Sequence, residues 1–568
     1  MTDTTIAPAA APRKQRTITA DVFRQFRQHR GGVIGACIFL TIILLVVFGP
    51  YIHGVDPSAL NIRDKNQGIS LAHPMGTDNL GRDMFAQVLA GGRTSLAVGV
   101  TAMLLSLLVG TTIGVTAGYV RRLDGWLMRL TDLFLALPRL DATDRRTARH
   151  LLARPTDGAS DPLGDGYAVP ARKSCRGHVC VHWVDSTADA PPSRAWVRTT
   201  LRALNSVWAA EVGDLGYREP RGDGHRGGDA RLDVYLKELG SRGIYGYCTP
   251  ERKVKGHKWL ASGYCVLDDD FARAQFGAPP RQSLRVTAAH EFFHAVQFAY
   301  DYGEDPWLLE ATATWMEERV ADDVNDNRQY LPYGQVGAPG RSLDRFDQRG
   351  FSQYGNWTFF EYLSSRFGVG VVRSIWTRAG AYPGAGHQYS TTAVKGVLAR
   401  HGGLLATYRG FAGANTTTTH SYEEGHGWPT APVAATWRLA DDHRSAHTRI
   451  TVDHLASRNV LVRPDSGLRD RRWRLKVAID GPAAATAPAA VVVSRTTKGL
   501  QRQAVTLGDD GRGTVRVGFS ARRVSWVKVA LVNASTRFSC WHRTTWSCQG
   551  RARDDDRHFA LTVTAVKG

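Results

Sequence analysis

The segment Leu284–Tyr300, LRVTAAHEFFHAVQFAY, decides how the central part of this chain folds and what it can bind. It contains no glycine or proline and predicts one helix, for which Ser283 is a suitable N-terminal cap. His290 and His294 lie one turn apart on the same helical face, so both can hold one zinc ion. Glu291 lies beside that face, where it can take a proton from a water molecule.

A second helix, expected from Trp307 to about Val320, carries the third predicted ligand. Glu310 would complete a set of two histidines and one glutamate, with a fourth position left open for water. With 19 His and 12 Glu in the chain, random placement would give the His-Glu-x-x-His pattern only roughly 0.01 times. Chance is therefore a poor explanation, although a surface helix with incidental histidines remains the alternative.

This region resembles the gluzincin branch of the zinc metalloproteases. From about residue 150 to 568 the chain is more closely similar to a family of secreted zinc metalloproteases of actinobacteria. The phrases that carry the likeness are HEFFHAVQFAYD from His290, LEATATWME from Leu309 and YGNWTFFEYL from Tyr354. The resemblance implies a hydrolase of peptide bonds, with Zn²⁺ as cofactor and a protein or peptide as substrate.

The same resemblance assigns roles residue by residue. Thr314 departs from the family pattern, because an acidic residue that orients a histidine ligand is expected there, and Glu317 is the candidate for that role. Tyr354 is the candidate that steadies the developing oxyanion, with a packed aromatic residue as the alternative. The resemblance also implies that the zinc ligands are His290, His294 and Glu310. It implies that the general base is Glu291.

The charge of the chain does not point to a nucleic-acid partner. The formal net charge is +20, and the cationic residues are spread along the sequence. Since no basic stripe interleaved with aromatic residues is present, we predict no nucleic-acid binding.

Six of the seven cysteines follow residue 170, in three near pairs. An even number of closely spaced cysteines predicts an oxidising compartment and disulfide bonds. Pairing between neighbours is the simplest of several connectivities and would join Cys175 to Cys180, Cys248 to Cys265, and Cys540 to Cys548. A metal site remains an alternative for the first pair, because His178, Cys180 and His182 alternate onto one face of a predicted strand.

The first 140 residues differ in character from the rest. Residues 1–20 are rich in Thr, Ala and Pro and predict a disordered cytoplasmic tail. Apolar runs at about 33–52 and 96–119 predict two transmembrane helices. Arginines at the outer flanks of both runs place the N-terminus and residue 121 in the cytoplasm.

Residues 21–140 resemble the permease subunit of dipeptide and oligopeptide ABC transporters. The matching phrases are HPMGTDNLGRD from His73, GRTSL from Gly92 and LDGWLMRLTD from Leu123. The likeness stops near Leu137, so the resemblance implies a truncated permease segment that lacks the helix for docking on the ATPase. It also implies other ABC-transporter subunits as candidate partners.

The two halves of the sequence predict different compartments. Two membrane spans would return the chain to the cytoplasm, whereas the paired cysteines predict an oxidising compartment. We therefore expect a fusion, joined near residues 138–145, of a truncated permease and a secreted metalloprotease. The predicted location is the cell membrane, through the N-terminal helices, with the protease domain outside the cell.

The rest of the chain predicts two further domains after a linker at 141–169. Residues 170–444 combine strand-like and helical segments, which predicts an α+β zincin-like metalloprotease domain. Residues 445–568 change to short alternating runs separated by turns, which predicts an antiparallel β-sandwich. Acidic loops at 222–229 and 268–270 are calcium candidates, but solvated turns explain them better.

These observations favour a zinc-dependent metallopeptidase fused to a truncated peptide-transporter permease segment. The alternative is a transmembrane permease component of a dipeptide or oligopeptide ABC transporter, built on the first 140 residues. A third interpretation is a binding module in which the metal site is structural.

Overall fold

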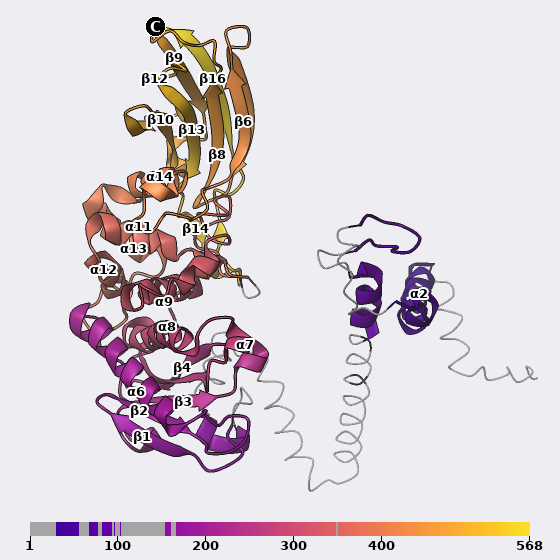
Figure 1. Cartoon of the computed structure of the whole chain (residues 1–568), viewed down its shortest axis with the longest axis vertical. Coiled ribbons are helices and arrows are strands. Elements are labelled where there is room, and N and C mark those ends of the chain that lie inside the picture. Colours follow the sequence, from indigo (N-terminus) through magenta and orange to yellow (C-terminus); the bar gives the residue numbers. More distant parts are fainter. Residues whose placement is uncertain are drawn as a thin grey trace, which may run out of the picture. The chain divides into compact units, whose positions relative to one another are not determined.

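Figure 1 shows the computed structural model of the chain. It describes residues 30–55, 67–77, 82–93, 154–160, 166–347 and 350–568, and the single positions 96, 101 and 103. The chain divides into two compact units, residues 1–141 and 142–568. The predicted tail at 1–20 and most of the predicted linker at 141–169 lie outside the described residues.

The first unit is built on helix α2, Arg30–His53, which contains Pro50. Proline has no amide hydrogen, so the carbonyl of Val46, four residues earlier, loses its helical partner. Arg93 takes the place of that partner, since its Nε lies 3.2 Å from the Val46 carbonyl and its Nη2 lies 2.7 Å from that of Val47. The arginine of the GRTSL phrase therefore stabilises the helix at the point where proline weakens it.

The run predicted to span a membrane at 33–52 is helical, since it lies within α2. Among the described residues, however, no helix combines the length and the apolarity that a membrane crossing requires. At the end of this helix, His53 and His73 both hydrogen bond to Asp83, at 3.1 and 2.7 Å. The second predicted span, at 96–119, lies outside the described residues except for positions 96, 101 and 103.

The second unit begins with a mixed sheet of five strands in the order β1-β2-β3-β5-β4. The pairs β2–β3 and β3–β5 are parallel, whereas β1–β2 and β4–β5 are antiparallel. Helix α6, Arg194–Trp208, makes the crossover from β2 to β3, and the side chain of Ser193 caps it by accepting from the amide of Trp196. The strands are β1 Arg172–Arg176, β2 Val179–Trp183, β3 Leu232–Lys237, β4 Gly246–Lys253 and β5 Ala261–Asp268.

Arg154, which falls within the predicted linker, is buried against this sheet. Its Nε lies 2.6 Å from Glu251 Oε1 and its Nη1 lies 2.5 Å from Asp233 Oδ2, while Nη2 pairs with Asp223. A buried guanidinium needs such partners, because leaving it unpaired costs several kcal/mol. The packing of the second unit therefore includes residue 154.

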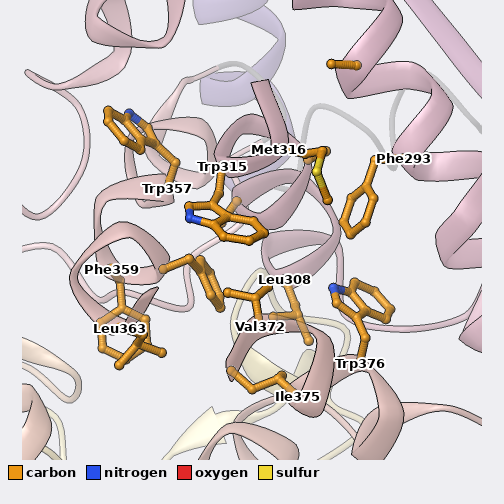
Figure 2. Close-up of a cluster of buried hydrophobic side chains, with 14 of the residues drawn as sticks. Phe293, Leu308, Trp315, Met316, Trp357, Phe359, Leu363, Val372, Ile375 and Trp376 are labelled. Atoms are coloured by element: carbon orange, nitrogen blue, oxygen red, sulfur yellow. The ribbon is translucent and has the colours of Figure 1, made fainter. Parts of the chain in front are cut away.

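Helices form the next layer, between this sheet and the C-terminal strands (Figure 1). Helix α8 packs over β5 and β4, and α9 packs on α8. Figure 2 shows the apolar core beside them, where Trp315 and Met316 of α9 lie near Phe293 of α8 and Trp376 of α12. The helices are α7 Arg273–Phe276, α8 Pro280–Asp301, α9 Pro306–Val320, α10 Ser352–Gly355, α11 Trp357–Phe367, α12 Gly370–Ala379, α13 Thr391–Leu398 and α14 Gly403–Asn415.

Helix α8 begins earlier than the sequence predicts. Pro279 occupies the N-cap position and Pro280 the first turn, so Ser283 lies inside the helix and is buried. Proline suits the first helical turn, because its φ angle is already helical and its missing amide hydrogen would have no partner there. The prediction of Ser283 as the cap is therefore wrong.

Three disulfides join neighbouring cysteines, which confirms the simplest pairing. Cys175–Cys180 links β1 to β2, Cys248–Cys265 links β4 to β5, and Cys540–Cys548 closes a loop near the C-terminus. The alternative metal site around His178, Cys180 and His182 is wrong, because the sulfur of Cys180 is bonded to Cys175 and is no thiolate ligand.

The C-terminal strands form two further sheets, in the orders β11-β10-β13-β8-β6 and β12-β9-β16-β7, with apolar side chains packed between them. The pairing is antiparallel as predicted, except that β6 runs parallel to β8. β6 lies before the domain boundary predicted at 445 and already belongs to this sandwich-like pair of sheets. The strands are β6 Val433–Leu439, β7 Ser445–Val452, β8 Ala456–Pro464, β9 Trp473–Asp480, β10 Pro488–Thr496, β11 Gly499–Val505, β12 Arg512–Gly518, β13 Val524–Asn533 and β16 Arg557–Lys567, with a short pair β14 Phe538–Ser539 and β15 Arg551–Ala552.

His454, between β7 and β8, joins the two sheets to the helical layer. Its Nε2 lies 2.8 Å from Oδ1 of Asp344, a fully buried carboxylate in the loop before α10, and its Nδ1 pairs with Asp555. Burial would lower the pKa of His454, but the two carboxylates outweigh it and raise this pKa to about 10. The charged histidine therefore holds two segments together that lie far apart in the sequence.

We predict that replacing this histidine weakens the joint strongly. His454→Gln leaves Asp344 as a buried charge without its counterion, so the free energy of unfolding should fall by about 3–5 kcal/mol. The measurement is chemical denaturation at pH 6, and His447→Gln, on an exposed position of β7, is the matched control. Equal stability of the two variants would contradict the assigned role.

The raised pKa also predicts how stability depends on pH. In the unfolded chain His454 loses its proton near pH 6.5, whereas in the folded protein it keeps it up to about pH 10. Its stabilising contribution is therefore complete below about pH 6.5 and is lost as the pH rises towards 10. The difference in melting temperature between the natural protein and His454→Gln should shrink over that interval, and a constant difference would contradict this linkage.

Candidate zinc site

Two helices bring the three predicted ligands together. His290 and His294 of α8 have ring centroids 4.9 Å apart, and Glu310 of α9 places Oε2 at 3.3 Å from His290 Nε2 and 3.6 Å from His294 Nε2. One donor atom from each residue lies within 4.8 Å of the other two. Donors bound tetrahedrally to one zinc ion, each at about 2.1 Å, stand roughly 3.4 Å apart, so this donor set fits zinc.

Both imidazole rings are held from their far side. His290 Nδ1 lies 2.7 Å from Glu317 Oε1, and His294 Nδ1 lies 2.7 Å from Gln297 Oε1. A ring that donates from Nδ1 presents the lone pair of Nε2, which is the form that binds a metal. Gln297 is itself fixed, because its Nε2 donates to the carbonyl of Leu309 at 2.9 Å. The arrangement orients both Nε2 atoms towards Glu310.

Glu291 is buried beside the two histidines, and its Oε2 has no hydrogen-bond partner among the described residues. Burial raises the pKa of this carboxyl above its usual value. A buried polar atom without a partner marks a place for water or another ligand. Glu291 is therefore placed to accept a proton from a molecule that enters the site.

The charges of the site suit a dication. Burial alone would raise the pKa of Glu310, but the charge of His294 and the hydrogen bonds of both histidines hold it far below its usual range. Burial lowers the pKa of His290, but hydrogen bonds to Glu310 and Glu317 outweigh it and raise the pKa overall. Burial raises the pKa of Glu317 to about 7, although this group bonds to His290. The site thus combines a firmly ionised carboxylate with two imidazole nitrogens, a set of charges that could accommodate a metal ion.

Tyr354, the candidate for oxyanion stabilisation, lies on α10 with its ring 6.0 Å from the ring of His290. The negative charge of Glu310 and burial raise the pKa of its phenol well above the usual value. The phenol therefore keeps its hydrogen and can donate it. Tyr354 also packs on Tyr330, with ring centroids 5.2 Å apart, as the alternative interpretation expects.

Two residues of this region escape prediction from the sequence. Gln297 follows His294 by three positions on the same helical face, which is a local signal that could have found it. Glu211 lies in a π-helical turn, Ala209–Asp214, where it is fully buried and neither carboxylate oxygen has a hydrogen bond among the described residues. Burial raises the pKa of Glu211, and the charge of His290 opposes that effect. Nothing in the local sequence signals this placement.

We predict that the support of His294 contributes measurably to metal affinity. Gln297→Ala removes the group that holds Nδ1, so zinc affinity should fall by about 10–100-fold. Competition with a chromogenic chelator measures this zinc affinity. Gln282→Ala, at an exposed position of the same helix, is the control. Unchanged affinity in Gln297→Ala would mean that this hydrogen bond does not position the ring.

Comparison with known proteins concerns the other end of the chain. Residues 17–74 match the family described as the N-terminal TM domain of oligopeptide transport permease C. A protein of Brucella abortus described as "Putative peptide transport system permease protein" is 39% identical over 115 residues, which cover 20% of this chain and 39% of that protein. The dipeptide transport system permease protein of Alkalihalophilus pseudofirmus is 35% identical over 119 residues, covering 21% of this chain and 39% of that protein.

The oligopeptide transport system permease protein of Bacillus subtilis is 34% identical over 129 residues, covering 22% of this chain and 42% of that protein. The chain thus spans about two fifths of the length of these relatives. These matches confirm the predicted likeness of the N-terminal region to peptide-transporter permeases.

Proposed function

We propose that the second unit is a zinc-dependent peptidase, in which His290, His294 and Glu310 bind the metal and Glu291 is the general base. One observation carries the proposal: two imidazole nitrogens and a carboxylate oxygen from two helices converge within 4.8 Å. The bonds from Glu317 and Gln297 support it, because they hold each ring at Nδ1 and direct both Nε2 atoms towards Glu310.

A zinc ion held there would act as a Lewis acid that lowers the pKa of water and polarises a carbonyl group. The protein side chains supply the proton transfers. Glu291, with its buried and unpaired Oε2, accepts the proton of the attacking water and returns it to the leaving amine. Tyr354 donates its phenolic hydrogen to the substrate oxygen as negative charge develops there.

The neighbouring sheet supports a peptide as the substrate. β4 is the outermost strand of its sheet and lies against α8. An extended peptide can pair with an outer strand through main-chain hydrogen bonds. Gly246, at the start of β4, lets this strand pack closely on the site, since a Cβ there would lie 3.1 Å from Cγ of Glu291 and 3.0 Å from the carbonyl of Val266.

We predict that Glu291→Ala keeps its metal and loses its activity. The base contributes to proton transfer and not to metal binding, so kcat/KM for a quenched fluorescent casein should fall about 10²–10⁴-fold at unchanged zinc content. His290→Ala should lose both the metal and the activity. Glu219→Ala, at an exposed site, is the control.

Two outcomes would contradict these assignments. Loss of zinc from Glu291→Ala would make this residue a ligand or a structural group. Full cleavage by the same variant would remove it from the reaction altogether. Elemental analysis by mass spectrometry, on the same samples that are assayed, distinguishes the two.

The second candidate function is a membrane component of a peptide ABC transporter. The match of residues 17–74 to a peptide permease family favours it for the N-terminal segment. On this proposal the segment attaches the chain to the cell membrane and contacts other transporter subunits. The disulfides favour an oxidising location for the second unit, outside the cell.

We predict that the full chain separates with membranes and that a chain lacking residues 1–140 does not. Co-expression with a peptide-transporter ATPase, followed by purification in detergent, tests whether the N-terminal segment binds another transporter subunit. Retention of the ATPase by the full chain alone supports a transporter component. Recovery of the full chain and of the shortened chain, both without the ATPase, would contradict a role as a transporter component. Membrane attachment would then be the remaining role of the N-terminal segment.

A further inference from the structure

A cavity of about 550 Å³ opens between the segment Thr416–His420, which follows α14, and the sheet β11-β10-β13-β8-β6. It shares no lining residue with the zinc site. Four of its lining side chains are basic, and Trp526 supplies a large aromatic surface. The basic residues are His420, Arg463, Arg495 and Lys528.

The cavity arises because one face of this sheet changes in character along its strands. On β10 and β13 the same face carries buried apolar residues, Val491, Val493, Ala530 and Val532, and α14 covers this part. Successive same-face positions alternate by two residues, so this face continues to Arg495 on β10 and to Lys528 and Trp526 on β13. There the helix has ended, and the charged part of the face remains open.

Strand register brings these side chains into two adjoining rows. Arg495 pairs with Trp526, and Val493 pairs with Lys528. Arg463 on β8 follows Val462, which is the partner of Val527 on β13. Trp526 therefore lies between two arginines on the neighbouring strands, about 5 Å away on either side.

The positive groups are not neutralised within the cavity. Among the described residues none of those that line it is an aspartate or a glutamate. Lys528 Nζ donates to the carbonyl of Thr416 at 2.7 Å, and Arg495 Nη1 lies 2.9 Å from His420 Nε2. Burial and the charge of Arg463 lower the pKa of Lys528. Like charges on adjacent strands repel, and a bound anion would relieve that repulsion.

The remaining lining residues indicate which chemical groups a ligand would carry besides its negative charge. Lys528 Nζ lies 5.2 Å from the centre of the Trp526 ring, so the cation and the flat surface are next to each other. Leu461 and Leu500 add apolar surface, and the threonines add hydroxyl groups. Arginine side chains recognise phosphate and carboxylate groups with paired hydrogen bonds. The volume lies in the range of pockets that bind small molecules.

We propose that this cavity binds a small organic oxyanion, with a phosphate or carboxylate group held by Arg463, Arg495 and Lys528 and a ring placed on Trp526. The proposal depends on the sandwich sheet and is independent of the function proposed for the zinc site.

The test is titration calorimetry of the full chain with phenyl phosphate, with phenol, benzoate and inorganic phosphate as comparison probes. Phenyl phosphate should bind more tightly than phenol or inorganic phosphate, because only it has both the ring and the charge. Arg463→Gln and Trp526→Leu should each weaken it about tenfold or more. Arg516→Gln, at an exposed position on β12 of the other sheet, should bind as the natural protein does.

Each result supports or contradicts the proposed binding of an organic oxyanion in the cavity. Tighter binding of phenyl phosphate than of benzoate assigns a phosphate ligand, and the reverse assigns a carboxylate. Equal binding of phenyl phosphate and phenol, or equal binding by Arg463→Gln and Arg516→Gln, overturns the proposal. Equal binding of inorganic phosphate and phenyl phosphate overturns the role of Trp526. Arg463 is exposed, so its replacement tests the site without disturbing the core, and melting temperatures check this.

Discussion

The contact between α8 and α9 is the constraint on which the second unit depends. Glu310 on one helix faces His290 and His294 on the other, and Glu317 binds the far nitrogen of His290. A shift of one helix by a fraction of a turn would separate these groups. The core beneath them prevents this, because large side chains such as Trp315 and Met316 fill the space between α9 and its neighbours. Close packing of the core therefore fixes the geometry of the site, because its histidine and glutamate side chains would not stay together in water by themselves.

Buried charges join the parts of the second unit at two other points. Arg154 connects the start of the unit to carboxylates on β3 and β4. His454 connects the loop before α10 to the sandwich through Asp344 and Asp555. Such pairs add little net stability compared with apolar packing, but a missing partner is costly, so each pair selects one arrangement of the segments it joins.

In the first unit, too, an arginine joins two segments that lie apart in the sequence. Pro50 removes one hydrogen bond from α2, and Arg93, from a segment some forty residues later, supplies donors to the carbonyls of Val46 and Val47. The phrases that make this region similar to peptide permeases thus include a residue with a clear structural task. The likeness covers about two fifths of those relatives, and the candidate metal site belongs to the other unit.

The sequence by itself determined the features that depend on near neighbours. The four-residue spacing of His290 and His294 places them on one helical face, and closely spaced cysteines pair with each other. Period-two alternation likewise predicted the change from helices to β-strands in the C-terminal region. Only the tertiary structure decided the burial of Glu211, the parallel pairing of β6 with β8, and the row of cations around Trp526. The reason is physical, because these features require segments far apart in the chain to meet, and local periodicity carries no information about the path between them.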